Sequence, residues 1–99
     1  MKKKKINKLL DKEWGKNVLA RDNYICQVCK KKGNQPHHII PKMFRILRWE
    51  IDNGITLCYS CHIANRYSAH KNAIWFSNWL KVNKPIQYLK ALLFLGIKE

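Results

Sequence analysis

Apolar side chains recur at every fourth position near the start of the chain. The four residues with this spacing are Ile6, Leu10, Trp14 and Val18. Residues four apart lie on one face of a helix, so the pattern predicts a helix over residues 6–21 whose apolar stripe packs on the core. Asp22 and Asn23 are typical of the end of such a helix.

A different pattern in the middle of the chain predicts two strands. Residues 36–41 begin and end with proline and contain an Ile-Ile pair. Residues before proline avoid helical conformations and isoleucine favours strands, so this stretch should be extended. Residues 54–57 should form the second strand, with an Asp-Asn-Gly turn at 52–54. A longer connection over residues 43–51 would join the two.

The last third of the chain predicts two helices, which are separated at Lys84-Pro85 because proline interrupts a helix. The first is expected to begin near Cys61 with Ser60 as its cap. Its expected buried side is Ile63, Tyr67 and Ile74. The second should run from Pro85 at its first position to Gly96 just past its end. Its expected core stripe is Ile86, Leu89, Leu92 and Leu93.

The cysteines suggest how so small a chain is stabilised. It has 99 residues, 46% of them apolar, and a core of this size usually needs a staple. All four cysteines fall into two C-x-x-C units, Cys26/Cys29 and Cys58/Cys61. Two disulfides, an iron–sulfur cluster or a four-cysteine zinc site would use them, and paired C-x-x-C thiols favour a metal site. Gly33 should permit the tight turn with which the backbone folds back after the first C-x-x-C unit.

The charge balance indicates the kind of partner. Twenty Lys and Arg residues against six Asp and Glu give a formal net charge of +14. An excess of this size predicts a polyanionic partner, most simply nucleic acid bound through its phosphates. Charge alone does not distinguish this partner from a ribosome or an anionic membrane surface. Residues 1–5 are expected to form a mobile basic tail that adds affinity without specificity.

The sequence predicts no membrane segment. Polar residues follow the basic start at once, so no apolar signal region forms. The apolar run over residues 91–95 is far shorter than the roughly 20 residues that cross a bilayer. Since the thiols are expected to be reduced, we expect a cytoplasmic protein without a membrane partner.

Three motifs occur in a fixed order. They are Cys26-x-x-Cys29, His37-His38-Ile39-x-Pro41 and Asn53-Gly54-Ile55-Thr56-Leu57-Cys58-x-x-Cys61-His62. This string resembles the small phage and bacterial HNH endonucleases. The resemblance implies an α+β fold with a ββα-metal (His-Me finger) core and a four-cysteine zinc site. It divides a single domain, 1–99, into a basic tail, an N-terminal helix over 6–21, the zinc-stapled core over 22–66 and a C-terminal helical extension over 67–99.

The histidines receive separate roles. Neighbouring residues on a strand point to opposite faces, so His37 and His38 should not do the same work. The resemblance implies that His37 and His62 bind a divalent metal and that His38 is the general base toward the attacking water. It also implies products with 5′-phosphate and 3′-hydroxyl ends. Asn53 is expected to bond across the loop with donor and acceptor, holding the hairpin that carries His38.

Two metal sites are therefore implied. Zn²⁺ accepts four thiolates tetrahedrally, so the four cysteines would form a closed structural site. The catalytic ion at His37 and His62 would be Mg²⁺, Mn²⁺, Ni²⁺ or Zn²⁺, because an open two-histidine site suits several ions.

Basic residues near the histidines are candidates for contacts to the DNA backbone. They are Lys42, Arg45, Arg48 and Arg66. Arg66 stands four residues beyond His62, where some relatives carry a further histidine ligand, and a helical turn would place it on the His62 face. A solvated surface charge is the competing interpretation for each. His70 is about 12 Å beyond His62 in a continuous helix, too far to share an ion, so we expect an ordinary histidine there.

Two functions follow. The resemblance implies a metal-dependent DNA endonuclease or nickase. The alternative is a zinc-stabilised nucleic-acid-binding module without cleavage, which would have no need for His37, His38 and His62 together. The sequence leaves open whether one copy, a homodimer on duplex DNA, or a complex with a partner phage protein acts, and which biological role it serves.

Overall fold

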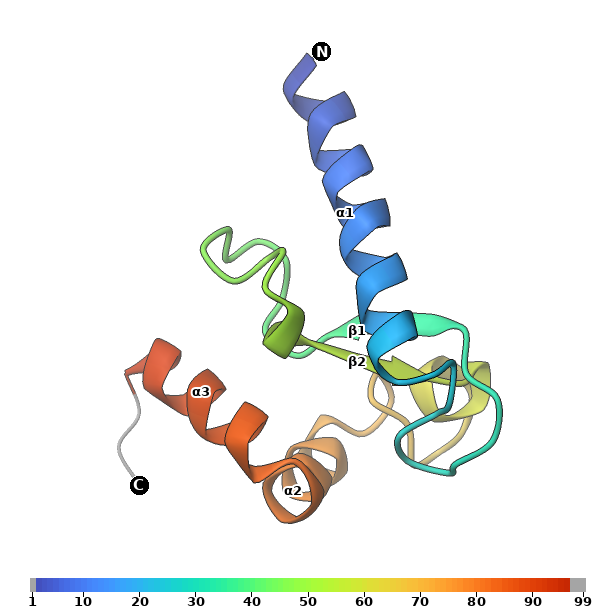
Figure 1. Cartoon of the computed structure of the whole chain (residues 1–99). Coiled ribbons are helices and arrows are strands. Elements are labelled where there is room, and N and C mark those ends of the chain that lie inside the picture. Colours follow the sequence, from blue (N-terminus) through green and yellow to red (C-terminus); the bar gives the residue numbers. More distant parts are fainter. Residues whose placement is uncertain (1, 97–99) are drawn as a thin grey trace.

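The architecture is that of a mixed α+β ββα core between longer helices, seen in a computed structural model that describes residues 2–96. The elements are α1 (Lys2–Arg21), β1 (Gln35–His38), the short 3₁₀ helix η1 (Ile51–Asn53), β2 (Gly54–Leu57), the π-helix η2 (Ser60–Ala64), α2 (Ala73–Asn83) and α3 (Pro85–Leu95). Figure 1 shows β1 and β2 between α1 on one side and the α2–α3 pair on the other. Within residues 2–96, no helix combines the length and apolar character that crossing a membrane requires.

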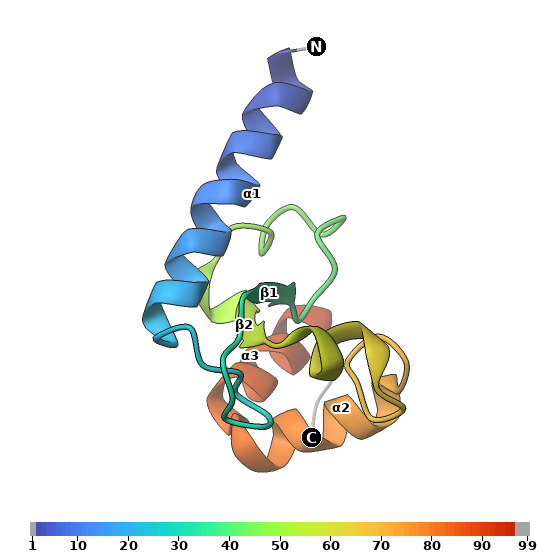
Figure 2. The same cartoon turned by 90° about the vertical axis from the view of Figure 1, so that its right-hand side faces the viewer.

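The first helix is longer and less buried than its pattern indicated. It begins at Lys2, so residues 2–5 are helical and exposed rather than a tail. Trp14 and Val18 are buried, but Ile6 and Leu10 are 55% and 41% exposed. The reason is visible in Figures 1 and 2, where the first half of α1 extends past the sheet and therefore does not pack on it. Only the second half of the predicted stripe contributes to the core.

The two strands form an antiparallel pair that positions the histidines. His37 pairs with Ile55 and His38 with Gly54. The second strand has the predicted bounds, whereas the first ends at His38 instead of continuing to residue 41. A Cβ on Gly54 would lie 2.4 Å from Cγ2 of Val18 and 2.6 Å from Cζ2 of Trp14. Glycine there lets α1 lie directly on the sheet.

The predicted helix after the second cysteine pair is wrong. The π-helix η2 ends at Ala64, and Asn65 adopts an extended conformation. A new helix, α2, starts at Ala73, where the side chain of Asn72 accepts a hydrogen bond from the Trp75 amide. Ser60 makes no cap, since the N-cap is Tyr59 without a side-chain bond.

The expected buried side of that helix is wrong as well. Ile63, Tyr67 and Ile74 are 40%, 52% and 87% exposed. Phe76 and Leu80 of α2 are buried instead. The apolar residues at 63, 67 and 74 belong to three different local structures, so their spacing does not define a common face.

The last helix has the predicted bounds but a different environment. Gly96 ends α3 in the left-handed conformation, with φ of 78°. None of its described residues is buried, so the stripe expected in the core lies half-covered or exposed. α3 packs beside α2 (Figure 1), and its apolar side is only partly covered.

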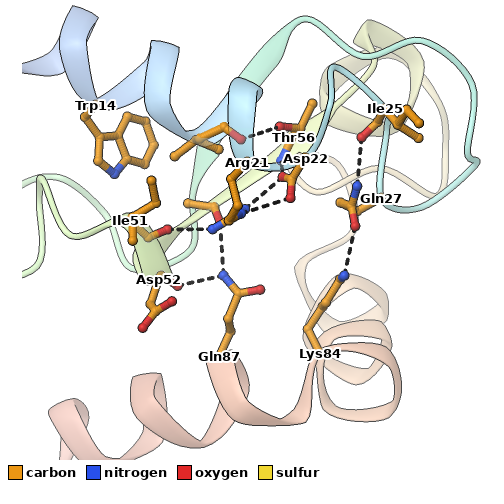
Figure 3. A network of polar contacts seen from close by, with 12 residues as sticks. Trp14, Arg21, Asp22, Ile25, Gln27, Ile51, Asp52, Thr56, Lys84 and Gln87 are labelled. Atoms are coloured by element: carbon orange, nitrogen blue, oxygen red, sulfur yellow. Dashed lines mark hydrogen bonds and ion pairs between the residues drawn. The ribbon is translucent and has the colours of Figure 1, made fainter.

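Polar contacts tie α1, β2 and α3 together (Figure 3). Arg21 donates to the Gly54 carbonyl at 2.8 Å, and the Asp22 carboxylate accepts the Thr56 amide at 3.0 Å. Gln87 of α3 donates to the same Gly54 carbonyl at 3.0 Å. Burial opposes ionisation of Asp22, but the bonds from Arg21 and Thr56 outweigh it and lower its pKa. The network fixes β2 opposite the histidine strand.

Candidate active site

The four cysteines converge at one end of the sheet. Their sulfur atoms lie within 4.8 Å of one another, and the Cys29 and Cys58 sulfurs are 3.7 Å apart. Four thiolates at the usual zinc–sulfur distance of about 2.3 Å would be about 3.8 Å apart in a tetrahedron. All four cysteines are free, so no disulfide forms. The cluster is compatible with a structural metal site.

Local backbone geometry explains the first pair. Lys30 takes the left-handed conformation, with φ of 68°, and its amide donates to the Cys26 carbonyl at 2.9 Å. A Cβ on Gly33 would lie only 2.8 Å from the Cys26 amide nitrogen. Gly33 is thus required for close approach of two backbone segments, while Lys30 makes the tight turn that had been expected of Gly33.

The thiols differ in their readiness to ionise. Burial opposes ionisation of Cys26, but backbone amides of Cys29, Cys58 and Val28 together lower its pKa to about 7. Burial and the neighbouring thiols raise the pKa of Cys61, and burial is the main cause of a raised pKa at Cys29. The metal-free cluster therefore retains protons at neutral pH that a bound cation must displace.

Three histidines form a second cluster. Candidate ligand atoms of His37, His62 and His70 lie within 4.8 Å of one another, and Nε2 of His62 is 3.0 Å from Nε2 of His70. The expectation for His70 is wrong, because it assumed a continuous helix. The chain folds back after Ala64, and the His70 amide donates to the His62 carbonyl at 3.0 Å.

Two rings in this cluster, those of His37 and His62, are held in the neutral form. Burial, followed by the neighbouring histidines, lowers the pKa of His37 to about 3. Burial and then His70 lower the pKa of His62 to about 4. Neutral imidazole is the form that binds a metal.

Gln35 orients His62, and the sequence reasoning missed it. Its Oε1 lies 2.7 Å from Nδ1 of His62, so Nδ1–H donates and the lone pair of Nε2 is directed toward the cluster. Gln35 and His37 are two residues apart on one strand and therefore share a face. That spacing is the signal that could have identified it.

His38 occupies the opposite side of β1. Its ring stacks on that of Trp14, with centroids 3.7 Å apart, and its Nε2 lies 2.8 Å from the Arg48 carbonyl oxygen. A carbonyl only accepts, so Nε2 carries the proton and Nδ1 keeps a lone pair. Burial is the main cause of a lowered pKa at His38.

Asn53 closes the loop that carries the Arg48 carbonyl. Its Oδ1 accepts the Ile40 amide at 2.8 Å, and its Nδ2 donates to the carbonyls of Ile40 at 3.0 Å and Leu47 at 3.1 Å. The side chain is buried. It uses donor and acceptor at once across the loop, the arrangement expected from the sequence.

The histidines border one open cavity of about 690 Å³. Its lining includes His37, His38, His62, His70 and Lys42. Although His37 and His38 leave the strand in opposite directions, both reach this space. The cavity is large enough for a phosphodiester and adjoining sugars.

The four basic residues that were expected to contact the DNA backbone lie in different environments. Lys42 is exposed at the cavity, and the Arg45 guanidinium lies 5.6 Å from the centre of the Trp49 ring. Arg48 is engaged with the Asp11 carboxylate at 2.9 and 2.7 Å. Arg66 is exposed on the bent segment after η2, so the helical turn that was to place it beside His62 does not exist.

Comparison with known proteins agrees with this geometry. Residues 26–67 match the family model of the HNH endonucleases. Neither the curated proteins nor the solved structures contain a match to the chain. The matched segment contains all four cysteines and three of the histidines described above, while His70 lies just outside it. Residues 26–67, fewer than half of the chain, are therefore similar to an HNH endonuclease domain.

Proposed function

We propose that the chain is a metal-dependent DNA endonuclease or nickase. The observation that carries the proposal is the cavity in which three imidazoles converge and a fourth, His38, has a free Nδ1. A module that only binds nucleic acid has no use for this combination. The products would carry 5′-phosphate and 3′-hydroxyl ends.

The donor set fits a divalent cation held by His37, His62 and His70. Three imidazoles would leave coordination positions of the cation open, as in catalytic sites. Imidazole suits Zn²⁺ or Ni²⁺ better than it suits Mg²⁺, which prefers oxygen ligands. When bound, the cation would stabilise negative charge on the phosphate and the leaving oxygen. Gln35 fixes the His62 ring for this purpose.

His38 would act as the general base. Its Nδ1 accepts a proton from the attacking water, while the Arg48 carbonyl holds Nε2–H and Trp14 keeps the ring from turning. Asn53 maintains the loop that supplies this carbonyl. Its contribution to catalysis is therefore positional.

The four cysteines would hold a structural Zn²⁺. The second pair leads directly into η2, which carries His62, and the first pair precedes β1, which carries His37 and His38. Joining the pairs fixes the strand and the π-helix relative to each other. Lys42, Arg45 and Arg66 would contact the DNA backbone around the site.

Plasmid nicking tests the proposal. Supercoiled plasmid is incubated with the protein and Mg²⁺, Mn²⁺, Ni²⁺ or Zn²⁺, beside a His38→Ala variant. We expect nicking by the original protein and a loss of at least about a hundredfold in the variant, since a general base contributes about that much. Binding of plasmid should be retained.

Equal nicking by both proteins would contradict the assignment of His38. A failure of both to nick with every cation, while DNA binding persists, would identify the chain as a zinc-stabilised binding module instead.

A further inference from the structure

A second cavity lies on the other side of the loop that holds His38. It has a volume of about 490 Å³ and is located between the first half of α1 and residues 42–48. Its basic lining residues are Lys4, Lys5, Lys8, Lys42 and Arg48. We call this cavity the arm cleft. Figures 1 and 2 show that this half of α1 stands away from the sheet.

The charge of the arm cleft is not neutralised from within. Asp11 is the acidic residue of its lining, and both carboxylate oxygens of Asp11 are taken by Arg48. Among residues 2–96, none of the ion pairs involves the four lysines of the cleft. Four ammonium groups therefore border one hollow without an internal counter-charge, which favours a polyanion there.

The arm cleft and the candidate active site share a lining residue. Lys42 lines both cavities. Arg48 lines the cleft with its side chain, while its carbonyl oxygen holds the His38 ring at 2.8 Å. From Lys4 to Asp11 the helix advances about 10 Å, the length of about three phosphates along one DNA strand.

The exposed apolar residues of this helix half support the same conclusion. Ile6, Leu9 and Leu10 are exposed, so burial in the core does not explain why α1 continues toward its N-terminus. A long helix projecting from the domain and lined with lysines on its cleft side offers a rigid row of charges.

We propose that the arm cleft binds the sugar-phosphate backbone of duplex DNA beside the scissile bond, with α1 as a projecting arm and Lys42 at the junction. This inference rests on the proposed function for the placement of the scissile bond. Contacts to phosphate carry no sequence information, so the arm would add affinity and register without selecting a sequence.

A pair of matched variants tests the arm cleft. Lys4→Gln/Lys8→Gln removes two charges from the cleft, and Lys12→Gln/Lys16→Gln removes two exposed charges from the same helix outside it. Binding to a short DNA duplex is measured over a range of salt concentrations, without added divalent cation and with the cysteine site loaded. Glutamine is a good helix former, and circular dichroism checks that α1 persists.

We expect the cleft variant to bind about tenfold or more weakly and its salt slope to fall by about 1.8, or about 0.9 for each lost phosphate contact. The control should keep its slope. Equal changes in the two variants would overturn the proposal, because the effect would then be one of overall charge. Weaker binding to anionic lipid vesicles by the cleft variant, with duplex binding unchanged, would overturn it too.

This experiment is separate from the test of the proposed function. If the cleft variant loses affinity for the duplex although the original protein does not nick DNA, DNA binding by the arm cleft is supported and the nuclease proposal is contradicted. If the original protein nicks DNA and the two variants bind the duplex equally well, the nuclease proposal is supported and the arm-cleft proposal is contradicted.

Discussion

The ring of His38 is held from two directions by residues distant in the sequence. Trp14 of α1 covers its face at 3.7 Å, and the Arg48 carbonyl accepts its Nε2–H at 2.8 Å. The first contact limits rotation, and the second selects the tautomer with a basic Nδ1. His38 therefore differs from a surface histidine in both orientation and basicity.

The pH dependence of nicking should reflect this environment. Burial lowers the pKa of His38 below the ordinary value of about 6.5. A general base must be neutral, so the rate should stay level from about pH 8 to about pH 6.5 and decrease only in more acidic solution. Nicking rates at saturating metal would measure this.

His37 and His62, two of the proposed metal ligands, should not cause that decrease. The pKa values of His37 and His62 are about 3 and about 4, and bound metal would lower them further. A rate that already halves above the ordinary histidine pKa would contradict the assignment of the base.

Gln35→Ala should weaken the histidine metal site. Without the acceptor for Nδ1–H of His62, the ring loses its orientation, and loss of such a partner typically costs about 10- to 100-fold in metal affinity. Competition with a chromophoric chelator would measure the dissociation constant. Gln35→Glu keeps an acceptor and serves as the matched control, so an equal loss in both variants would contradict the positioning role.

The different surroundings of His37 and His38 follow from the alternation of side chains along a strand, and the Asn53 bonds follow from its amide group. The same alternation places Gln35 on the face of His37, but His70 could not be recognised in this way. His70 depends on how the chain folds back between Ala64 and Ala73, which local periodicity does not encode.

At the scale of elements, the segments with strong local signals at both ends were the easier ones to predict. Residues 54–57 and the helix between Pro85 and Gly96 have strong local signals at both ends, and their bounds are as predicted. The predicted helix after Cys61 failed because its apolar spacing continues across Asn65, where the backbone becomes extended. Helix propensity is overridden here by the backbone hydrogen bonds that bring the chain back against η2.

The contact of α1 with the sheet gives a test of stability. Gly54→Ala would place a methyl group 2.4 Å from Val18 and 2.6 Å from Trp14. We expect it to destabilise the protein by about 1–3 kcal/mol, as overpacking of a core does. Urea unfolding would measure the free energy.

Gly15→Ala is the matched control for this test. The new Cβ would lie 3.1 Å from the nearest atom of Pro36, and alanine favours the helix by about 1 kcal/mol over glycine. If Gly54→Ala were no more destabilising than Gly15→Ala, the close packing of α1 on β2 would be contradicted.

At the scale of the whole molecule, the cysteine cluster joins the loop of the first cysteine pair to the end of β2 and to η2. Removal of a bound metal with a strong chelator should unfold the core, since the ten buried apolar residues among positions 2–96 are a small core for such a chain. Far-ultraviolet circular dichroism would follow the loss of structure, and added Zn²⁺ should restore it. Retention of the native spectrum after complete metal removal would contradict a structural role.

Metal binding should also release protons. The raised pKa values of Cys29 and Cys61 keep these thiols protonated at neutral pH, so binding should release about two protons or more and tighten as the pH rises. Calorimetric titration with Zn²⁺ in two buffers of different ionisation enthalpy would count them. Proton release near zero would contradict thiolate ligation.

The order of the motifs was sufficient to predict the fold class, whereas the nucleic-acid partner indicated by the charge stays a prediction. The direction of α1 was not predictable from them. Its stripe continues toward the N-terminus beyond the reach of the sheet, so the same pattern describes a buried half and a projecting half.

The antiparallel register has one more consequence. His37 and His38 are chemically identical, and only their alignment against Ile55 and Gly54 assigns one ring to the cluster with His62 and His70 and the other to Trp14. A single residue inserted ahead of β1 that slipped the pairing by one position would exchange the two sides of the strand. Such an insertion would leave every side chain of the motif present, yet give each imidazole its neighbour's surroundings.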